Sequence, residues 1–401
     1  MKNLERWRKN LYVLWVTQIC SMIGFNIALP FTAYYFQEMG VTSATQLNYY
    51  VGLSSTLPSI TMAIFAPIWG IVADLHGRKL MILRAMLAAA ILIGLLGMTD
   101  SVYVFLGLRL LQGIFTGTVG ASMAFVSANT PENKMSFSLG FMTSSNFLGY
   151  ALGPVLGGIL AEIIGYRGCF YAGAAVMFVG FLLVLLLVKE NPNTYGKALK
   201  AQMAVENGKK PKLMNKYIVL VLTILITAKI ARTLFSPFVA LYVQERLGTI
   251  TGAATYTGII NGATGVATAV AALTLTRLGD RYDKFKLVMI FSVISLGISI
   301  FFIPKWPLLV FAAIYGLYFL AAGSVEPLLT SAASEATDPA LRGELFGMMT
   351  TVNSVALIIS PMVAAAVSNA LSVSAILVFM PILTVVQIIV LIVCKRAKEK
   401  L

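Results

Sequence analysis

The stretch Gly70-Ile71-Val72-Ala73-Asp74-Leu75-His76-Gly77-Arg78-Lys79 joins two long apolar runs, residues 47–72 and 80–98. Glycines bound it, and it carries one acid followed by two bases. A tight connection between two helices needs such flexible, polar residues. Basic residues also collect on the side of a membrane that is not translocated. The stretch therefore predicts a short turn between two membrane-spanning helices.

The alternation of apolar run and polar turn continues through all 401 residues, of which 58% are hydrophobic and 11% charged. Ordinary soluble domains have roughly 25% charged residues, and about 20 apolar residues cross a bilayer as a helix. We predict an all-α integral membrane protein with twelve transmembrane helices. The predicted helices are 11–36, 47–72, 80–98, 102–126, 137–163, 168–188, 217–243, 253–276, 287–304, 307–333, 345–368 and 371–394.

A long polar stretch between the sixth and seventh helices divides the chain into two halves. We predict an N-terminal six-helix bundle over residues 1–190, a cytoplasmic linker over 191–216 and a C-terminal six-helix bundle over 217–401. Three sequence elements recur in order at a spacing of 207 residues or one less, which predicts two pseudo-symmetric bundles around a central cavity. The pairs are Pro30-Phe31-Thr32-Ala33-Tyr34-Tyr35 with Pro237-Phe238-Val239-Ala240-Leu241-Tyr242, Asp74 with Asp280, and Gly153-Pro154 with Ser360-Pro361.

The net charge is +14, and the distribution of the basic residues along the chain indicates how the chain is oriented in the membrane. Lys2, Arg6, Arg8 and Lys9 precede the first apolar run, and the polar stretch between the two halves is also basic. The opposite side has few basic residues. This asymmetry places both termini in the cytoplasm, and we expect a multi-pass protein of the cell (plasma) inner membrane with no nucleic acid partner.

The opening stretch fits the pattern GxxADxxGRK, with Gly70, Asp74, Gly77 and Arg78 at its defining positions. This pattern resembles the signature of the major facilitator superfamily, and the resemblance implies the major facilitator fold. The structural interpretation is a tight turn. The functional one is that Asp74 and Arg78 form a charge latch against the helix that begins near Gly343, because a helix N-terminus attracts a carboxylate.

The predicted helix 137–163 carries glycines at regular spacing. Three of them recur every fourth residue and form a smooth ridge that allows another helix to pack closely, and the proline beside them kinks the helix. We expect the partner to be the segment 253–276, which carries its own glycines. The full spacing resembles the signature of the superfamily's proton-coupled drug exporters, which favours export. The residues are Gly140, Gly149, Gly153, Pro154, Gly157 and Gly158.

Arg109 lies inside the predicted helix 102–126, in Leu108-Arg109-Leu110-Leu111-Gln112-Gly113. A charge at the centre of a membrane span costs about 2.5 to 3.5 kcal/mol, so it normally faces a cavity or a partner. Backbone carbonyls could hold it in a purely structural role. Arg109, Gln112 and Gly113, with Gly117 beyond, resemble the exporters' second motif, RxxQGxG, and that resemblance implies a role for Arg109 in proton coupling.

Three further charges are predicted to be buried within helices: Lys229, Arg232 and Glu326. Counting about 1.5 Å of rise per residue places Lys229 and Glu326 within reach of each other. A structural ion pair and a proton-binding carboxyl group both fit, because burial of a carboxyl group favours its uncharged form.

The substrate cavity is predicted to have an excess of positive charge, since Arg109, Lys229 and Arg232 face Glu326 alone. Exporters of cationic drugs often carry an acid in the first helix, where this chain has Asn26. The excess would suit anionic or zwitterionic substrates. The predicted cavity residues are Asn26, Tyr34, Gln112, Asn146, Lys229, Arg232, Phe235, Tyr315 and Tyr318.

The chain has no GxxxxGK[ST] loop for ATP and no HExxH motif. We predict that it is not an enzyme, that it holds no cofactor or metal, and that a proton gradient supplies the energy. The predicted function is proton-coupled export of small amphiphilic compounds by alternating access, with Arg109, Glu326 and Asp74 in proton coupling. It would act as a monomer in the lipid bilayer, similar to the bacterial multidrug exporters. The alternatives are a dedicated exporter of an anionic metabolite or chelator, and a non-transporting sensor with a transporter fold.

Overall fold

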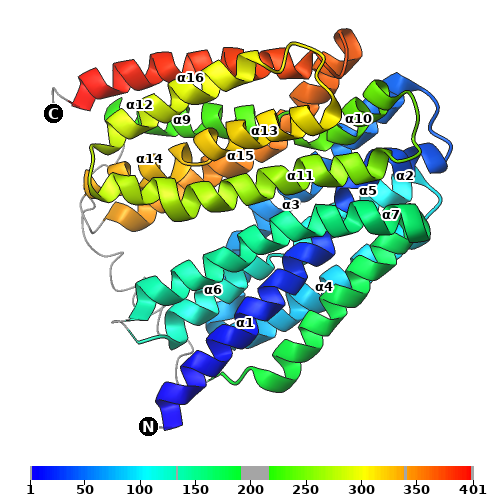
Figure 1. Cartoon of the computed structure of the whole chain (residues 1–401). Coiled ribbons are helices and arrows are strands. Elements are labelled where there is room, and N and C mark those ends of the chain that lie inside the picture. Colours follow the sequence, from blue (N-terminus) through cyan, green and yellow to red (C-terminus); the bar gives the residue numbers. More distant parts are fainter. Residues whose placement is uncertain (1, 132–133, 191–215, 338–340, 399–401) are drawn as a thin grey trace. The chain divides into compact units, whose positions relative to one another are not determined.

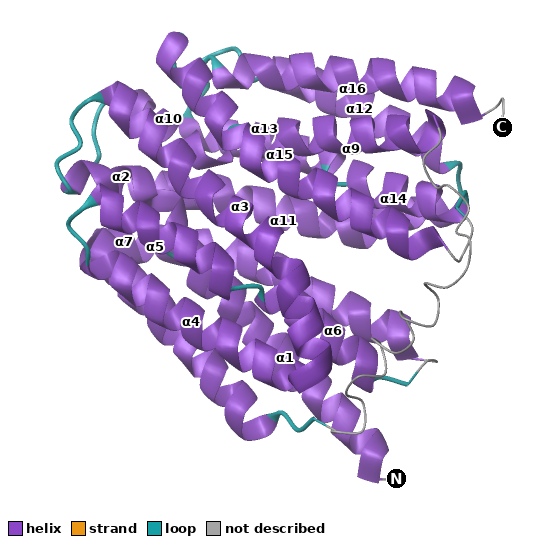
Figure 2. Cartoon of the chain, turned by 180° about the vertical axis from the view of Figure 1, so that it is seen from behind, coloured by secondary structure: helices purple, strands orange, loops and turns teal. Residues whose placement is uncertain are grey.

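The computed structural model describes residues 2–131, 134–190, 216–337 and 341–398. Helices and the turns between them make up this part of the chain, and no strand occurs in it (Figure 2). The predicted linker, residues 191–216, lies outside the described residues except for Lys216. The all-helical character agrees with the prediction from the apolar runs.

Contacts divide the chain into two compact units. Unit 1 contains Met1–Tyr35 and Leu57–Gly208, and unit 2 contains Phe36–Thr56 and Lys209–Leu401. The segment Phe36–Thr56 precedes the predicted linker in the chain but packs within unit 2. The predicted bounds of the two bundles and of the linker stay a prediction.

Unit 1 contains most of the first half of the chain (Figure 1). Two of its elements, α2 and α3, continue into the segment that packs within unit 2. Its elements are α1 (Lys2–Asn26), η1 (Leu29–Phe31), α2 (Thr32–Glu38), α3 (Ala44–His76), α4 (Arg78–Met98), α5 (Val102–Phe115), α6 (Thr118–Asn129) and α7 (Met135–Leu187).

Unit 2 contains the second half of the chain. Its elements are α9 (Lys216–Thr233), η4 (Ser236–Phe238), α10 (Val239–Leu247), α11 (Ala253–Val270), η5 (Ala271–Leu275), η6 (Thr276–Asp280), α12 (Lys284–Ile300), α13 (Leu308–Ala322), α14 (Val325–Glu335), α15 (Arg342–Ala370) and α16 (Ile376–Lys398).

Ten helical segments of the described chain are long and apolar enough to cross a membrane. One of them, Phe137–Leu187, covers two predicted spans, because α7 contains a break at Gly165. Gly165 has φ of 71°, a conformation that residues with a side chain rarely adopt. The predicted span 287–304 corresponds to α12, whose 17 residues make it slightly shorter than the others. Each of the twelve predicted spans therefore has a helical counterpart.

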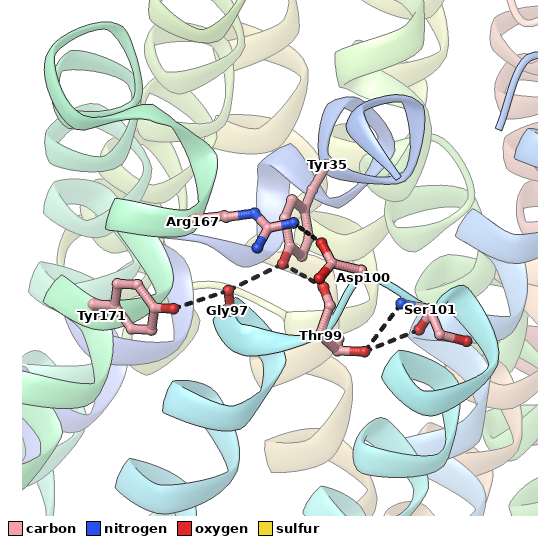
Figure 3. Close-up of polar contacts among 7 residues, drawn as sticks. All are labelled: Tyr35, Gly97, Thr99, Asp100, Ser101, Arg167 and Tyr171. Atoms are coloured by element: carbon pink, nitrogen blue, oxygen red, sulfur yellow. Dashed lines mark hydrogen bonds and ion pairs between the residues drawn. The ribbon is translucent and has the colours of Figure 1, made fainter. Parts of the chain in front are cut away.

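In unit 1, α7 packs against both α1 and α4 (Figure 1). Figure 3 shows how α2, the end of α4 and the part of α7 that follows its break are tied together. The Tyr35 hydroxyl lies 2.8 Å from the Thr99 carbonyl oxygen and 3.1 Å from that of Gly97, and Tyr171 donates to the same Gly97 carbonyl at 3.2 Å. Arg167 forms an ion pair with Asp100 beside them. Tyr35, the last residue before the chain enters unit 2, is thus anchored in unit 1.

The segment Phe36–Thr56 is held within unit 2 by side-chain amides. Gln37 and Gln244 exchange two hydrogen bonds of 2.8 and 3.0 Å, and the Asn48 amide donates to Asn369 at 2.8 Å. Thr56 donates to the Ile358 carbonyl oxygen at 3.1 Å. These polar contacts explain why this segment clusters with unit 2.

The core of unit 2 joins α9, α12, α14, α15 and α16 through buried aliphatic side chains such as Val221, Val288, Leu329 and Leu345. An aromatic cluster continues this core around Phe235 and Phe311. Apolar packing therefore surrounds the polar residues of α9, α14 and α15.

Candidate transport site

The most polar site inside a membrane-spanning segment of unit 2 centres on Glu326, in the first turn of α14. Arg232, on α9, donates a hydrogen bond from Nη2 to Glu326 Oε2. The Nζ atom of Lys229, one turn earlier on α9, lies 3.6 Å from the same oxygen. Asn353, on α15, donates from Nδ2 to Glu326 Oε1 at 3.0 Å. Two helices, α9 and α15, therefore contribute donors to the two oxygens of a carboxylate on a third helix, α14.

These side chains are largely withdrawn from solvent: 11% of the Arg232 side chain and about a quarter of those of Lys229 and Glu326 are exposed. Charges in such surroundings are stable only when paired and hydrogen-bonded. Two cations face one carboxylate, so the cluster has an excess positive charge. Arg232 Nε and Asn353 Oδ1 are buried with no hydrogen-bond partner among the described residues. The arrangement can therefore hold charged groups inside the membrane, and it leaves two buried polar atoms without a partner among the described residues.

The sequence predicted that Lys229 and Glu326 approach each other, and the structure brings them together. It also shows that Arg232 is the nearer cation. The sequence analysis did not include Asn353. One signal could have identified it: Asn353 follows the predicted cavity residue Asn146 at the repeat spacing of 207 residues.

Arg109 lies on α5 in unit 1 and is 9% exposed. One partner of its guanidinium group is the side-chain oxygen of Gln112, one helical turn later. Gln112 is 2% exposed, and its Nε2 has no partner among the described residues. The next residue, Gly113, lies directly against Thr61 and Pro58 of α3, where a Cβ atom would clash. The stretch from Arg109 to Gly113 thus combines a buried polar pair with a close helix contact.

The helix that carries Arg109 is interrupted just beyond this pair. Gly117, with φ of 124°, separates α5 from α6. That backbone conformation strongly favours glycine. Gly117 therefore marks a break in a membrane-spanning segment.

The glycine ridge on α7 packs against the end of α1 and the residue that follows it, Ile27. A Cβ atom at Gly153 would lie 2.6 Å from Asn26 Cβ, and one at Gly149 would clash with Met22. At Gly157 it would clash with the backbone of Ile27. Within unit 1 the ridge therefore faces α1 and the residue that follows it. The partner expected from the glycine pattern, the segment 253–276 with Gly258, Gly262 and Gly265, lies in unit 2, and that expectation stays a prediction. The spacing of the glycines on α7 correctly predicted a close approach of another helix, but it does not indicate which helix that is.

The other predicted cavity residues lie in the packed interior of each unit. Asn26 donates to the Met22 carbonyl oxygen at 2.7 Å, and Asn146 accepts from Gln18 at 3.1 Å. Tyr34 is fully buried, with its ring centroid 5.4 Å from that of Tyr166. The three aromatic residues of unit 2 that were predicted to line the cavity are at most 1% exposed, and Tyr315 contacts each of the other two: they are Phe235, Tyr315 and Tyr318.

The opening sequence stretch forms the end of α3 and the start of α4. Glu190 accepts hydrogen bonds from the backbone N–H groups of Arg78 and Lys79, each at 2.9 Å. It thereby caps the N-terminus of α4, a role that the sequence analysis missed because nothing in the spacing links residue 190 to residue 78. The side chains of Asp74, and of Arg342 and Glu344 on either side of Gly343, are not among those that the structure describes. The charge latch of Asp74 and Arg78 against the helix that begins near Gly343 therefore stays a prediction. No group of three His, Cys, Asp or Glu in the described chain could hold a metal ion.

An all-helical membrane protein with a duplicated bundle and charged residues inside its spans has the features of a secondary transporter. The family profile described as Major Facilitator Superfamily matches residues 14–248 and 221–401. The chain therefore belongs to the Major Facilitator Superfamily, a family of transporters and not of enzymes.

Curated relatives of similar length extend this assignment. The chain is 30% identical over 367 residues to the multidrug resistance protein MdtG of Salmonella arizonae, which covers 90% of this chain and 89% of the relative. The protein of the same name from Salmonella typhimurium matches with the same identity and coverage.

Solved structures share the fold at lower identity. The human organic anion transporter MFSD10 has a TM-score of 0.69 and 17% identity, covering 96% of this chain and 99% of that one. A bacterial homolog of the human lysosomal transporter Spinster, in an inward-facing and occupied conformation, has a TM-score of 0.76 and 13% identity, covering 96% of both chains.

Proposed function

We propose that this transporter exports small amphiphilic compounds and takes up protons in exchange. The observation that carries the proposal is the buried carboxylate of Glu326, held by Lys229, Arg232 and Asn353 inside a membrane-spanning segment. Ionisable residues at such positions commonly form proton pathways. The name of the Salmonella relatives, multidrug resistance protein, supports export of drug-like compounds.

Glu326 binds the transported proton in this proposal. Protonation removes its negative charge and frees Arg232 and Lys229 from their shared partner. Arg109 acts in unit 1 through its pair with Gln112, and Asp74 biases the exchange between conformations. The chain works as a monomer in the cell membrane, with both termini in the cytoplasm, which the distribution of basic residues supports.

The test is transport by purified protein in liposomes with an imposed pH gradient. We expect Glu326→Gln to lose uphill transport that depends on the gradient and to retain downhill flux, because the amide cannot bind the proton but preserves the shape of the side chain. The matched control is Glu335→Gln, on the same helix, where a largely exposed carboxylate pairs with Lys284. If Glu326→Gln still concentrates substrate with the wild-type dependence on the pH gradient, Glu326 is structural.

A second candidate function is export of an anionic compound. It is favoured by the excess positive charge of the cluster, because Lys229 and Arg232 face a single carboxylate. A proton bound at Glu326 would raise the positive charge of the cluster and thereby strengthen binding of an anion at Lys229. A bound anion would in turn strengthen proton binding at Glu326. By linkage this coupling is reciprocal. Such positive coupling opposes exchange of a proton for an anion at Glu326, so in this candidate the anion leaves the cell without a proton entering through that residue.

The two candidates therefore differ in the sign of one measurement. For an anionic probe, binding to wild-type protein is measured as a function of pH and compared with Glu326→Gln. If Glu326 is the exchange site, protons weaken substrate binding in the wild type, and the variant loses this dependence. If acid pH strengthens anion binding through Glu326, the exchange mechanism at this residue is excluded for that substrate.

A further inference from the structure

A pocket of about 510 Å³ lies in unit 1 at one end of three helices: the start of α1, the start of α4 and the end of α7. Three cations line it, Arg6, Lys79 and Lys189, together with one carboxylate, that of Glu190. The pocket lies outside the transport site described above, and positive charge is in excess there.

The carboxylate of Glu190 is already engaged, because its two oxygens accept hydrogen bonds from the backbone N–H groups of Arg78 and Lys79. This carboxylate already occupies the N-terminus of α4, so a further anion in the pocket would be bound by side-chain cations and not by the helix end. The backbone of Lys189 is fixed on Asn10 by two hydrogen bonds of 2.8 and 3.1 Å. One cation of the pocket is therefore anchored to α1 through its own backbone.

The remaining walls of the pocket are apolar, and one of them continues along the lipid-facing side of α4. Leu80 and Leu83 line the pocket, and Leu80 is 51% exposed. Leu87, Ile91 and Leu95 follow on the same face of the helix, with exposures of 36%, 54% and 39%. At about 1.5 Å per residue, Leu80 to Ile91 spans about 16 Å, close to half of the roughly 30 Å hydrocarbon core of a bilayer.

We propose that this pocket binds an anionic membrane phospholipid, with the phosphate group on Arg6, Lys79 and Lys189 and an acyl chain along the exposed face of α4. Charge complementarity requires an anion, and basic pockets at the ends of transmembrane helices suit anionic head groups. The apolar face that begins in the pocket and extends for one leaflet distinguishes a lipid from a soluble phosphate.

The experiment measures lipid retention by the full-length protein in detergent, using native mass spectrometry with phosphatidylglycerol and phosphatidylcholine. We expect one phosphatidylglycerol to be retained in preference to phosphatidylcholine. At about 1 kcal/mol for each basic residue, removing two cations in Lys79→Gln/Lys189→Gln should weaken this binding about 30-fold. Lys79→Arg/Lys189→Arg keeps both charges and should bind as the wild type does.

The matched control is Lys286→Gln/Lys305→Gln, which makes the same charge change at two exposed lysines of unit 2 and should leave retention unchanged. Equal loss in this control, or equal retention of phosphatidylcholine, would overturn the proposal. So would displacement of the lipid by inorganic phosphate or glycerophosphoglycerol at the lipid's own concentration, since the site would then recognise a soluble phosphate.

If the double glutamine variant fails to fold, the single variant Lys189→Gln tests the proposal. The hydrogen bonds between Lys189 and Asn10 are made by the backbone of Lys189, so the substitution leaves them in place. Lys189→Gln should weaken binding of phosphatidylglycerol about fivefold.

Discussion

The same helix crossing is built differently in the two units. In unit 1, Gly153 of α7 lies against Asn26 of α1 so closely that a Cβ atom would be 2.6 Å from Asn26 Cβ. In unit 2, the equivalent positions 207 residues later are Ser360 and Thr233, whose hydroxyl groups form a 2.8 Å hydrogen bond. One crossing depends on the absence of a side chain, and the other on a polar pair.

The charges follow the same division. Lys229 and Arg232 of unit 2 occupy the repeat positions of Met22 and Phe25 in unit 1. Likewise Asn353 hydrogen-bonds Glu326, whereas the equivalent Asn146 accepts from the uncharged Gln18. The duplicated framework thus carries a charge cluster at this level in one unit and neutral contacts in the other. We therefore expect transport to be most sensitive to changes of side-chain size at this crossing in unit 1. Changes of charge at the equivalent level should affect transport in unit 2.

The largest effect is expected for Gly153→Leu. The leucine side chain cannot fit between α7 and α1, so we expect transport to be abolished while membrane insertion persists. The matched control is Gly140→Leu on the same helix, since a Cβ atom there would meet no other atom within 4 Å. Transport assays at equal expression measure the difference, and normal transport by Gly153→Leu would show that the ridge is not a working interface.

Arg109→Ala is expected to reduce both uphill and downhill transport to roughly a tenth or less, because it removes the buried cation and leaves Gln112 without its partner. The equivalent position in unit 2 is the uncharged Tyr315, so no second arginine can substitute. Flux in liposomes measures the effect, with the exposed Arg281→Ala as the control. Retained downhill flux in Arg109→Ala would restrict Arg109 to coupling alone.

The sequence predicted the spans because their length and apolar character are set by the bilayer. It also predicted the approach of Lys229 and Glu326, since depth along a helix can be counted. It did not predict that α1 faces the glycine ridge, because a smooth surface does not specify its partner. Nor did it identify the cap by Glu190 or the transfer of Phe36–Thr56 to unit 2, which depend on individual hydrogen bonds between residues far apart in the chain.

A smaller effect is expected for Ser360→Ala, which removes the hydroxyl pair with Thr233 but no apolar packing. The loss should be about 1 kcal/mol of stability, typical of one hydrogen bond. Thermal unfolding in detergent measures it, and a double variant with Thr233→Val should add little further loss if the two hydroxyl groups act as a pair. A transport defect as severe as that of Gly153→Leu would contradict the distinction between the two crossings.

The smallest effect is expected for Asp74→Asn. A carboxylate near a helix N-terminus contributes about 0.3 to 1 kcal/mol. Loss of a latch of this strength in Asp74→Asn can therefore slow the exchange between conformations by up to about fivefold. The latch would not contact the ligand, and substrate affinity should therefore stay at the wild-type value. Asp280→Asn, in the degraded counterpart of unit 2, is the matched control and should slow transport less, because its surroundings lack the GxxADxxGRK pattern. Transport rate and equilibrium binding, measured on the same preparation, separate the two effects. A large loss of affinity in Asp74→Asn with an unchanged distribution of conformations would mean that Asp74 acts on the substrate and not on the latch.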